Sequence, residues 1–193
     1  MNYPINEIYY SIQGEGFYSG RPAVFIRFSG CNLKCPFCDT DFRKCTEMKG
    51  EEILAKVDMF DSKFVVLTGG EPGLYVDRPL INLLREHGKY IAMETNGTRC
   101  LKGKIDWVTV SPKTDFCNDA EVVLPKCNEV KVVFNGHDIS HFLMIPADYY
   151  YLQPCDTGDR MENERLLKMA VEYCKHHPQW SLSLQIHKIL NIK

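Results

Sequence analysis

The sequence predicts an α/β fold, an incomplete TIM-like barrel of about six parallel strands that forms a single domain over residues 1–193. Short runs of β-branched and aromatic residues recur along the chain, and amphipathic segments lie between several of them. Strands that alternate with helices pair in parallel through right-handed crossovers. A closed eight-stranded barrel takes about 250 residues, so an incomplete barrel is the more economical interpretation of 193 residues. An open doubly wound sheet is the alternative.

The predicted strands are runs that end at Gly, Pro, Asn or Ser. They cover residues 23–28, 63–68, 90–95, 106–111, 129–134 and 149–154. In both candidate architectures the functional groups lie at the carboxyl ends of the strands, where the loops converge. We therefore expect the site in the segments that directly follow these runs.

The predicted helices cover residues 50–60, 77–88 and 159–177. In the second, Pro79 suits a first helical turn and Gly88 suits the position after the last turn. In the third, Asp159 and Glu162 form a capping-box pattern. Its apolar residues recur at helical spacing and predict one buried face, made of Leu166, Leu167, Ala170, Val171 and Cys174.

Composition excludes several classes of partner. Lys and Arg total 23 against 25 for Asp and Glu, and the net charge of -2 argues against a surface that coats nucleic acid or anchors to a membrane. The first ten residues lack a basic and then apolar signal pattern, and no run has the apolar length of a membrane span. We expect a cytoplasmic protein that acts on a small polar molecule.

The chain has nine cysteines, an odd number that does not suggest a disulfide framework. Cys31, Cys35 and Cys38 form the one tight cluster. The others are dispersed and are expected to be small buried core residues; they are Cys45, Cys100, Cys117, Cys127, Cys155 and Cys174.

The cysteine cluster directly follows the predicted strand 23–28, at the expected functional edge. Structural zinc takes four ligands, and Cys45 could supply the fourth, so a zinc site is one alternative. A four-iron cluster takes one cysteine per iron, so three cysteines leave one iron open to a substrate or cofactor.

A second motif, "VLTGGEPGL", follows the predicted strand 63–68. Gly69 and Gly70 remove side chains where backbone could approach a ligand, although a Gly-Gly pair alone is also typical of a tight turn. Together, "CNLKCPFCD" and "GGEP" resemble the radical S-adenosylmethionine (SAM) superfamily and imply its core fold.

The resemblance implies that Cys31, Cys35 and Cys38 bind a 4Fe-4S cluster whose open iron takes SAM. Later strand ends in "METNGT", "VSPK" and "YLQP" match the superfamily's cofactor-binding segments. The SAM-binding residues implied in this way are Gly70, Glu94, Asn96, Ser111, Pro112, Lys113 and Gln153. No catalytic residue is expected beyond the cluster and SAM.

The stretch "YYSIQGEGFYSGRPAVFIRFSGCNLKCPFCDT" narrows the resemblance to the 7-carboxy-7-deazaguanine synthase family, and the similarity extends over nearly the whole chain. It implies a carbon-nitrogen lyase of queuosine and 7-deazapurine biosynthesis. In that family a 5'-deoxyadenosyl radical abstracts hydrogen from 6-carboxy-5,6,7,8-tetrahydropterin, and ring contraction with loss of ammonia gives 7-carboxy-7-deazaguanine.

The same resemblance implies substrate contacts at Ile12, Gln13, Gly14, Glu15, Arg27 and Thr68. Arg27 offers five donors in a geometry that suits a carboxylate. The alternative is structural, with Arg27 paired to a protein carboxylate and "QGEG" acting as a turn.

Thr40 follows the "CD" pair and, by resemblance, binds Mg2+, which prefers oxygen ligands; alternatively, Asp39 or Thr40 only caps a turn. A flavodoxin or ferredoxin electron donor and a homodimer are expected on the same basis. A glycyl-radical enzyme activating enzyme and a zinc-stabilised, non-enzymatic α/β module are the alternative functions.

Overall fold

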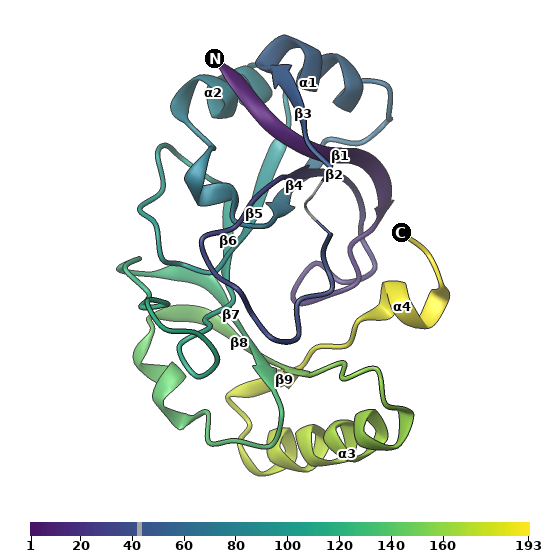
Figure 1. The fold of residues 1–193 in the computed structure, drawn as a ribbon, viewed down its shortest axis with the longest axis vertical. Coiled ribbons are helices and arrows are strands. Elements are labelled where there is room, and N and C mark those ends of the chain that lie inside the picture. The colour runs from purple at the N-terminus through teal and green to yellow at the C-terminus, as the bar shows by residue number, and fades with distance from the viewer. Residues whose placement is uncertain (42–43) are drawn as a thin grey trace.

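The structure is a computed structural model that describes residues 1–41 and 44–193 (Figure 1). One nine-stranded sheet forms its centre, in the order β3-β1-β2-β4-β5-β6-β7-β8-β9. The strands are β1 (Asn2–Ile12), β2 (Pro22–Phe28), β3 (Thr46–Lys49), β4 (Phe64–Gly69), β5 (Tyr90–Thr95), β6 (Trp107–Val110), β7 (Cys127–Phe134), β8 (Ala147–Pro154) and β9 (Trp180–Leu182). The helices are α1 (Gly50–Val57), α2 (Arg78–Glu86), α3 (Arg160–His176) and α4 (Ile186–Leu190), with 3-10 turns η1 (Pro72–Leu74) and η2 (Ser140–Met144).

All six predicted strands are present, and every neighbouring pair from β2 to β9 is parallel. The sheet is open, with β3 and β9 as its edges, so the expected incomplete barrel is confirmed. The sequence analysis missed β1 and β3, which extend the sheet in antiparallel fashion, and the short edge strand β9.

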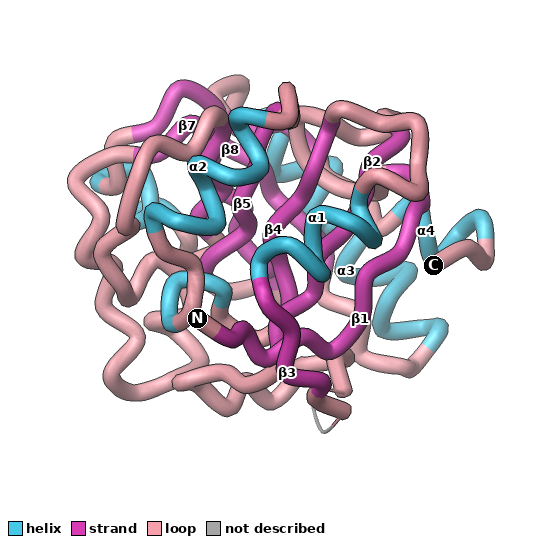
Figure 2. Tube along the Cα trace, turned by 90° about the horizontal axis from the view of Figure 1, so that it is seen from above, coloured by secondary structure: helices cyan, strands magenta, loops and turns pink. Residues whose placement is uncertain are grey.

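The two faces of the sheet differ in character. On β2, Val24, Ile26 and Phe28 belong to an apolar cluster shared with α1 and α2. A second cluster joins outward residues of β7 and β8 to α3. Figures 1 and 2 show α1 and α2 beside the first half of the sheet and α3 beside β8 and β9. Because α1 to α3 cover the same face, the doubly wound alternative is wrong, and the opposite face is left for the site.

The start of α2 follows the sequence signals. The Asp77 carboxylate accepts a hydrogen bond from the Leu80 N–H at 3.1 Å, and Pro79 lies in the first turn. The Tyr3 hydroxyl of β1 also donates to Asp77, at 2.6 Å. Gly88 follows the helix with φ +71°, a conformation that glycine adopts without strain. One side chain therefore both caps α2 and joins it to β1.

Two details of the other predicted helices differ from expectation. The helix predicted over 50–60 ends at Val57. In α3, Asp159 caps the first turn, but Glu162 pairs with Arg165 instead of completing the capping box. Leu167 is 37% exposed, because the face that packs on the sheet centres on the buried Leu166 and Ala170.

The amino ends of the inner face are filled by the loop between β1 and β2. The Phe17 ring stacks on Trp107 with 4.6 Å between centroids, and Tyr18 packs on Phe64 at 4.8 Å. The Arg21 guanidinium lies 4.3 Å from the Phe64 ring centroid. We call Phe17, Tyr18 and Arg21 the aromatic plug. Since it occupies the amino ends of the strands, the inner space that remains lies at their carboxyl ends.

Among residues 1–41 and 44–193, no helix combines the length and apolar character that crossing a membrane requires.

Candidate active site

A cavity of about 1010 Å³ lies at the carboxyl ends of the parallel strands. Its walls come from the β1–β2 loop, the cysteine loop, the ends of the central strands and the C-terminal segment. The predicted site residues that line it are Ile12, Gln13, Gly14, Glu15, Arg27, Cys31, Cys35, Cys38, Thr40, Thr68, Gly70, Glu94, Asn96, Ser111, Lys113 and Gln153. Pro112 is buried and is not among the lining residues. The topology therefore gathers predicted residues from six segments of the chain.

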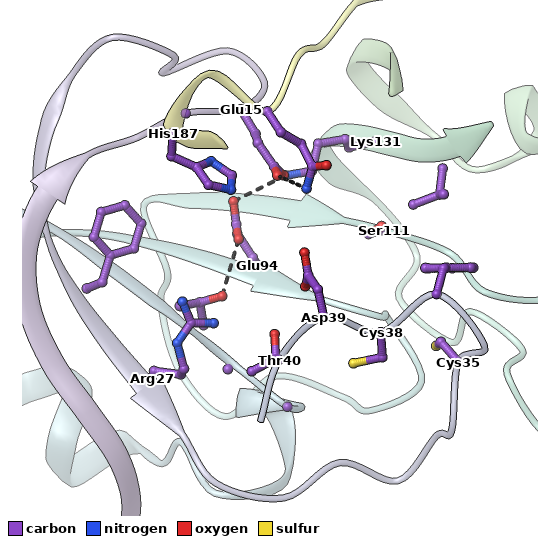
Figure 3. Close-up of a pocket in the computed structure, with 18 of the residues that line it drawn as sticks. Glu15, Arg27, Cys35, Cys38, Asp39, Thr40, Glu94, Ser111, Lys131 and His187 are labelled. Atoms are coloured by element: carbon purple, nitrogen blue, oxygen red, sulfur yellow. Dashed lines mark hydrogen bonds and ion pairs between the residues drawn. The ribbon is translucent and has the colours of Figure 1, made fainter. Parts of the chain in front are cut away.

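The three clustered cysteines are free thiols that line this cavity. Figure 3 shows two of them, Cys35 and Cys38. The Leu33 N–H donates to the Cys31 Sγ at 3.4 Å, which suits a sulfur that carries negative charge. Burial raises the pKa of Cys31, and burial together with a hydrogen bond shared with Cys117 raises that of Cys35 to about 12. A metal would reverse this preference, because a coordinating thiol loses its proton.

A fourth thiol lies beside the cysteine loop. The Sγ atoms of Cys117 and Cys35 are 3.6 Å apart, and the Phe116 ring packs edge-on against Phe37 with 4.7 Å between centroids. The expectation that Cys117 is a dispersed core residue is therefore wrong. Its place soon after the predicted strand 106–111, at the functional edge, was the available signal.

Cys45 does not join this group. It is exposed, lies 4.0 Å from the Glu47 carboxylate and is absent from the cavity lining. Cys100 is also exposed, so neither is the buried core residue expected. Within the described ranges, no three Cys, His, Asp or Glu side chains are grouped as ligands of a single metal ion. A four-iron cluster needs no such convergence, since each cysteine binds a different iron.

The "GGEP" segment packs on the cysteine loop. The Gly70 N–H donates to the Phe28 carbonyl at 3.1 Å, and the Glu71 N–H donates to the Gly30 carbonyl at 3.0 Å. A Cβ atom on Gly70 would overlap the Gly30 carbonyl oxygen. The second glycine is therefore required for close packing between these two backbones, before any ligand is considered.

Glu71 is a buried acid whose role the sequence analysis did not assign. Its carboxylate accepts hydrogen bonds from the N–H of Gly73, the hydroxyl of Thr95 and the N–H of Asn96, each at 2.7 Å. Burial raises its pKa, and these donors oppose the rise. Asn96 also donates to Asn32 of the cysteine loop at 3.1 Å. Glu71 thus fixes the end of β5 against the cysteine loop.

Lys113 places a cation near the cysteines. Its Nζ atom donates to the Ser111 carbonyl at 2.8 Å and to the Ser111 hydroxyl at 2.5 Å, and lies 6.0 Å from the Phe37 ring centroid. Burial lowers the pKa of Lys113 to about 8, against the opposing charge of Cys35. An anionic ligand group at this position would stabilise the ammonium form.

Glu94 lies with the residues predicted for the substrate. Gln13 Nε2 donates to Glu94 Oε1 at 3.1 Å, and the Thr68 hydroxyl donates to Glu94 Oε2 at 3.2 Å. Lys131 Nζ contacts Glu94 Oε1 at 3.3 Å. Glu94, predicted to contact SAM, thus also belongs to a second polar group, away from the cysteines.

Arg27 has protein partners of its own. Its Nε donates to Glu7 at 3.1 Å and its Nη2 to the Tyr9 hydroxyl at 2.8 Å. The structural alternative is therefore partly right. Because the guanidinium carries five N–H groups and lines the cavity, donors remain for a ligand carboxylate.

The C-terminal segment covers the β1–β2 loop. The Ile186 N–H donates to the Gly14 carbonyl and Gln185 Nε2 to the Glu15 carboxylate, both at 3.1 Å. A Cβ atom on Gly14 would overlap the His187 ring. Figure 3 shows His187 beside Glu15 and Glu94. The chain's last residues are therefore part of the cavity wall.

Lys188 links this segment to the cysteine loop. Its Nζ atom lies 2.7 Å from carboxylate oxygens of both Asp39 and Asp156. Hydrogen bonds from Lys188 and the Gly158 N–H lower the pKa of Asp156 to about 2. Asp39 is thus an ion-pair partner, while the adjacent Thr40 hydroxyl faces the same cavity.

Comparison with known proteins agrees with this geometry. The family model of the radical SAM superfamily matches residues 25–131. A 7-carboxy-7-deazaguanine synthase of Bacteroides thetaiotaomicron is 49% identical over 189 residues, 98% of each chain. One of Burkholderia multivorans is 41% identical over the whole of both chains. The chain belongs to the 7-carboxy-7-deazaguanine synthase family.

The fold of this family is shared as well. The crystal structure of QueE from Escherichia coli matches with a TM-score of 0.80 at 29% identity, over 96% of this chain and 94% of that one. Membership of the 7-carboxy-7-deazaguanine synthase family confirms the resemblance drawn from the motifs. It leaves the glycyl-radical activating enzyme and the zinc-stabilised module without support.

The radical SAM superfamily implies a 4Fe-4S cluster and SAM, and the residues of this synthase family member fit both. Three thiols from one loop face one cavity, and the Cys31 sulfur accepts a backbone N–H. The backbone of Gly70 and the polar ends of β5, β6 and β8 lie around the same space. This donor set suits a cluster with one iron free of protein ligands.

Proposed function

We propose that this chain converts 6-carboxy-5,6,7,8-tetrahydropterin to 7-carboxy-7-deazaguanine with release of ammonia. One observation carries the proposal: a single cavity joins the three-cysteine loop to a polar group that combines Arg27 with the carboxylates of Glu15 and Glu94. The substrate has a carboxylate and a ring edge rich in N–H donors, so its binding site needs both a cation and acceptors.

Cys31, Cys35 and Cys38 are proposed to hold the cluster, and the side chains around it to hold SAM. The proposed SAM contacts are Gly70, Asn96, Ser111, Lys113 and Gln153. When bound, the cluster and SAM supply the radical that removes a hydrogen atom from the substrate. The Lys113 ammonium is suited to an anionic group of the cofactor, because it is buried beside the cysteine loop.

The remaining residues orient the substrate. Arg27 donates to its carboxylate, while Gln13, Thr68 and the backbone of Ile12 and Gly14 meet the ring edges. The C-terminal segment shields the site from water, since it packs over Gly14 and closes one wall of the cavity. Holding the substrate hydrogen near the reactive centre and excluding other donors is the protein's contribution to rate.

A magnesium ion at Thr40 is a further part of the proposal. The Thr40 hydroxyl faces the cavity next to Asp39, and Mg2+ completes its octahedral shell with waters and substrate oxygens. A flavodoxin or ferredoxin donor, a homodimer and a cytoplasmic location stay predictions.

Anaerobic turnover tests the function. The reconstituted protein is incubated with reductant, SAM and 6-carboxy-5,6,7,8-tetrahydropterin, and products are followed by mass. We expect 7-carboxy-7-deazaguanine and ammonia in equal amounts, and neither when SAM is omitted or Cys38 is replaced by Ser. Cleavage of SAM without any deazapurine would overturn the assigned substrate and keep only the superfamily chemistry.

A further inference from the structure

The polar end of the cavity contains a buried lysine among three carboxylates. Lys131 is 5% exposed and projects from the inner face of β7. Burial would lower its pKa, but the charges of Glu15, Glu94 and Glu129 outweigh burial and raise it. Figure 3 shows Lys131 and Glu15 in contact above Glu94. The surrounding carboxylates therefore favour the charged form of Lys131.

Lys131 joins three distant segments of the chain. Its Nζ atom lies 2.5 Å from Glu15 Oε2, in the β1–β2 loop, and 3.3 Å from Glu94 Oε1, on β5. Burial alone would raise the pKa of Glu15, yet Lys131 and the Gln185 amide lower it to about 2. One ammonium between two carboxylates offsets their mutual repulsion and lets them lie close together.

The remaining contacts leave both carboxylates able to accept more hydrogen bonds. Gln185 donates to Glu15 Oε1, while Gln13 and Thr68 donate to the two oxygens of Glu94. A carboxylate offers about four lone-pair positions. Both side chains line the cavity that a ligand would enter.

Paired acceptors select for a particular ring edge. The 2-amino-4-oxopyrimidine half of a pterin presents an amino group and a ring N–H side by side, and two parallel donors suit a carboxylate. In a lumazine a carbonyl oxygen replaces that amino group. An acceptor facing an acceptor leaves both unpaired, which a buried site penalises.

We propose that Lys131 is a positioning residue that holds Glu15 and Glu94 side by side as neighbouring acceptors and thereby selects a 2-aminopyrimidinone ring over its 2-oxo analogue. The inference rests on the proposed function, because it assumes that a pterin occupies this end of the cavity. Lys131 itself is assigned no contact with the reacting atoms. It acts on the ligand through Glu15 and Glu94.

Equilibrium binding tests this selectivity. The probes are 6-carboxypterin and 6-carboxylumazine, titrated calorimetrically into the anaerobic, SAM-loaded protein. We expect the native chain to prefer the pterin by at least about tenfold, roughly 1.4 kcal/mol. Lys131→Met should reduce this preference to within about threefold, mainly because the variant binds 6-carboxypterin more weakly. Lys131→Arg, which keeps the charge, should restore most of it.

Two further variants keep the test decisive. Glu15→Gln leaves Lys131 in place and, through its amide donor, should shift preference towards the lumazine even if Lys131→Met does not fold. Lys89→Met is the matched control, because Lys89 is also a shielded lysine paired with a carboxylate, Asp58 at 2.7 Å, but does not line the cavity. It should leave both affinities unchanged.

The outcomes separate this inference from the proposed function. Two results would overturn the role of Lys131 while turnover by the native protein stays intact. In the first, Lys131→Met and Glu15→Gln both keep the native preference for the pterin. In the second, Lys131→Met binds both ligands equally more weakly and Lys131→Arg does not restore the binding. If the native protein neither binds 6-carboxypterin nor converts the tetrahydropterin, the proposed function itself fails, and this inference with it.

Discussion

Gly70 is the residue at which the cysteine loop and the "GGEP" segment come closest. A side chain there would overlap the Gly30 carbonyl, which accepts a hydrogen bond from the Glu71 N–H. We expect Gly70→Ala to destabilise the protein by at least about 2 kcal/mol, because backbone would have to move. Urea unfolding measures the change. Gly158→Ala is the control, since that position is open and costs only its positive φ.

If Gly70→Ala lowers the free energy of unfolding no more than Gly158→Ala does, the backbones of the cysteine loop and the "GGEP" segment can move apart at little cost.

Cys35 and Cys117 are neighbours with different expected roles. We expect Cys35→Ser to lose most of the bound iron after anaerobic reconstitution, because a cluster ligand is removed. Cys117→Ser should keep the iron and the visible absorption, since three cysteines remain. Iron analysis and absorption spectra measure both.

If Cys117→Ser also loses its iron, Cys117 is a ligand and the open iron on which SAM binding depends is not available.

The sequence could predict which residues line the site, but not which of them contact one another when they are far apart in the chain. Motif positions such as Cys31 and Arg27 follow directly from local order along the chain. Cys117 meets Cys35 across 82 positions, and Lys131 meets Glu15 across 116. Such contacts depend on strand order and register, which no local pattern encodes.

At the scale of the element, α2 depends on one carboxylate. Asp77 accepts hydrogen bonds from the Leu80 N–H and the Tyr3 hydroxyl. We expect Asp77→Ala to cost about 2 kcal/mol, through loss of the cap and an unpaired Tyr3 hydroxyl. Thermal or urea unfolding measures it. Asp77→Asn keeps an acceptor and should cost clearly less; equal losses would mean that the charge, and not the cap, stabilises α2.

The C-terminal segment is held by hydrogen bonds and ion pairs, and α4 contains no buried residue, so the segment should open independently of the core. We expect Lys188→Met to change global stability by no more than about 1 kcal/mol, because exposed ion pairs contribute little. Amide exchange at Ile186 and Ile192 should nevertheless become faster, since Lys188 no longer holds the segment to Asp39 and Asp156.

Exchange measured by mass spectrometry, with Lys175→Met on α3 as control, checks this. Unchanged protection of the segment would show that its backbone hydrogen bonds suffice.

Alternating and apolar runs were enough to predict the central strands, because these are buried on the helix-covered face. β9 has only three residues, too few to show a period. β1 carries polar residues and Pro4 within it and pairs antiparallel at the edge region, so its pattern is weak. Leu167 fits helical spacing yet lies beside the contact face, because the burial stripe of α3 is narrow.

Over the whole molecule, Glu129 should make stability depend on pH. Burial raises its pKa, against the charge of Lys131, and its Oε1 atom has no hydrogen-bond partner in the described structure. The folded protein then holds this proton at pH values where the unfolded chain has released it. Stability should therefore fall as pH rises above the ordinary value of 4.5.

Glu129→Gln removes this titration. We expect the free energy of unfolding of the native chain, relative to the variant, to decrease between about pH 4.5 and pH 7. Urea unfolding over that range measures it, with the exposed Glu121→Gln as control. Parallel curves for the native chain and Glu129→Gln would contradict the shifted titration.

The aromatic plug packs against one of the two tryptophans of the chain, and the apolar cluster shared with α3 contains the other. Trp107 stacks in the plug on the inner face, whereas Trp180 is buried with Tyr150 on the outer face. The protein thus carries a fluorescent reporter for each layer. Replacing either indole by Phe leaves a single emitter. Its spectrum follows the packing of the aromatic plug in one variant and the release of α3 in the other.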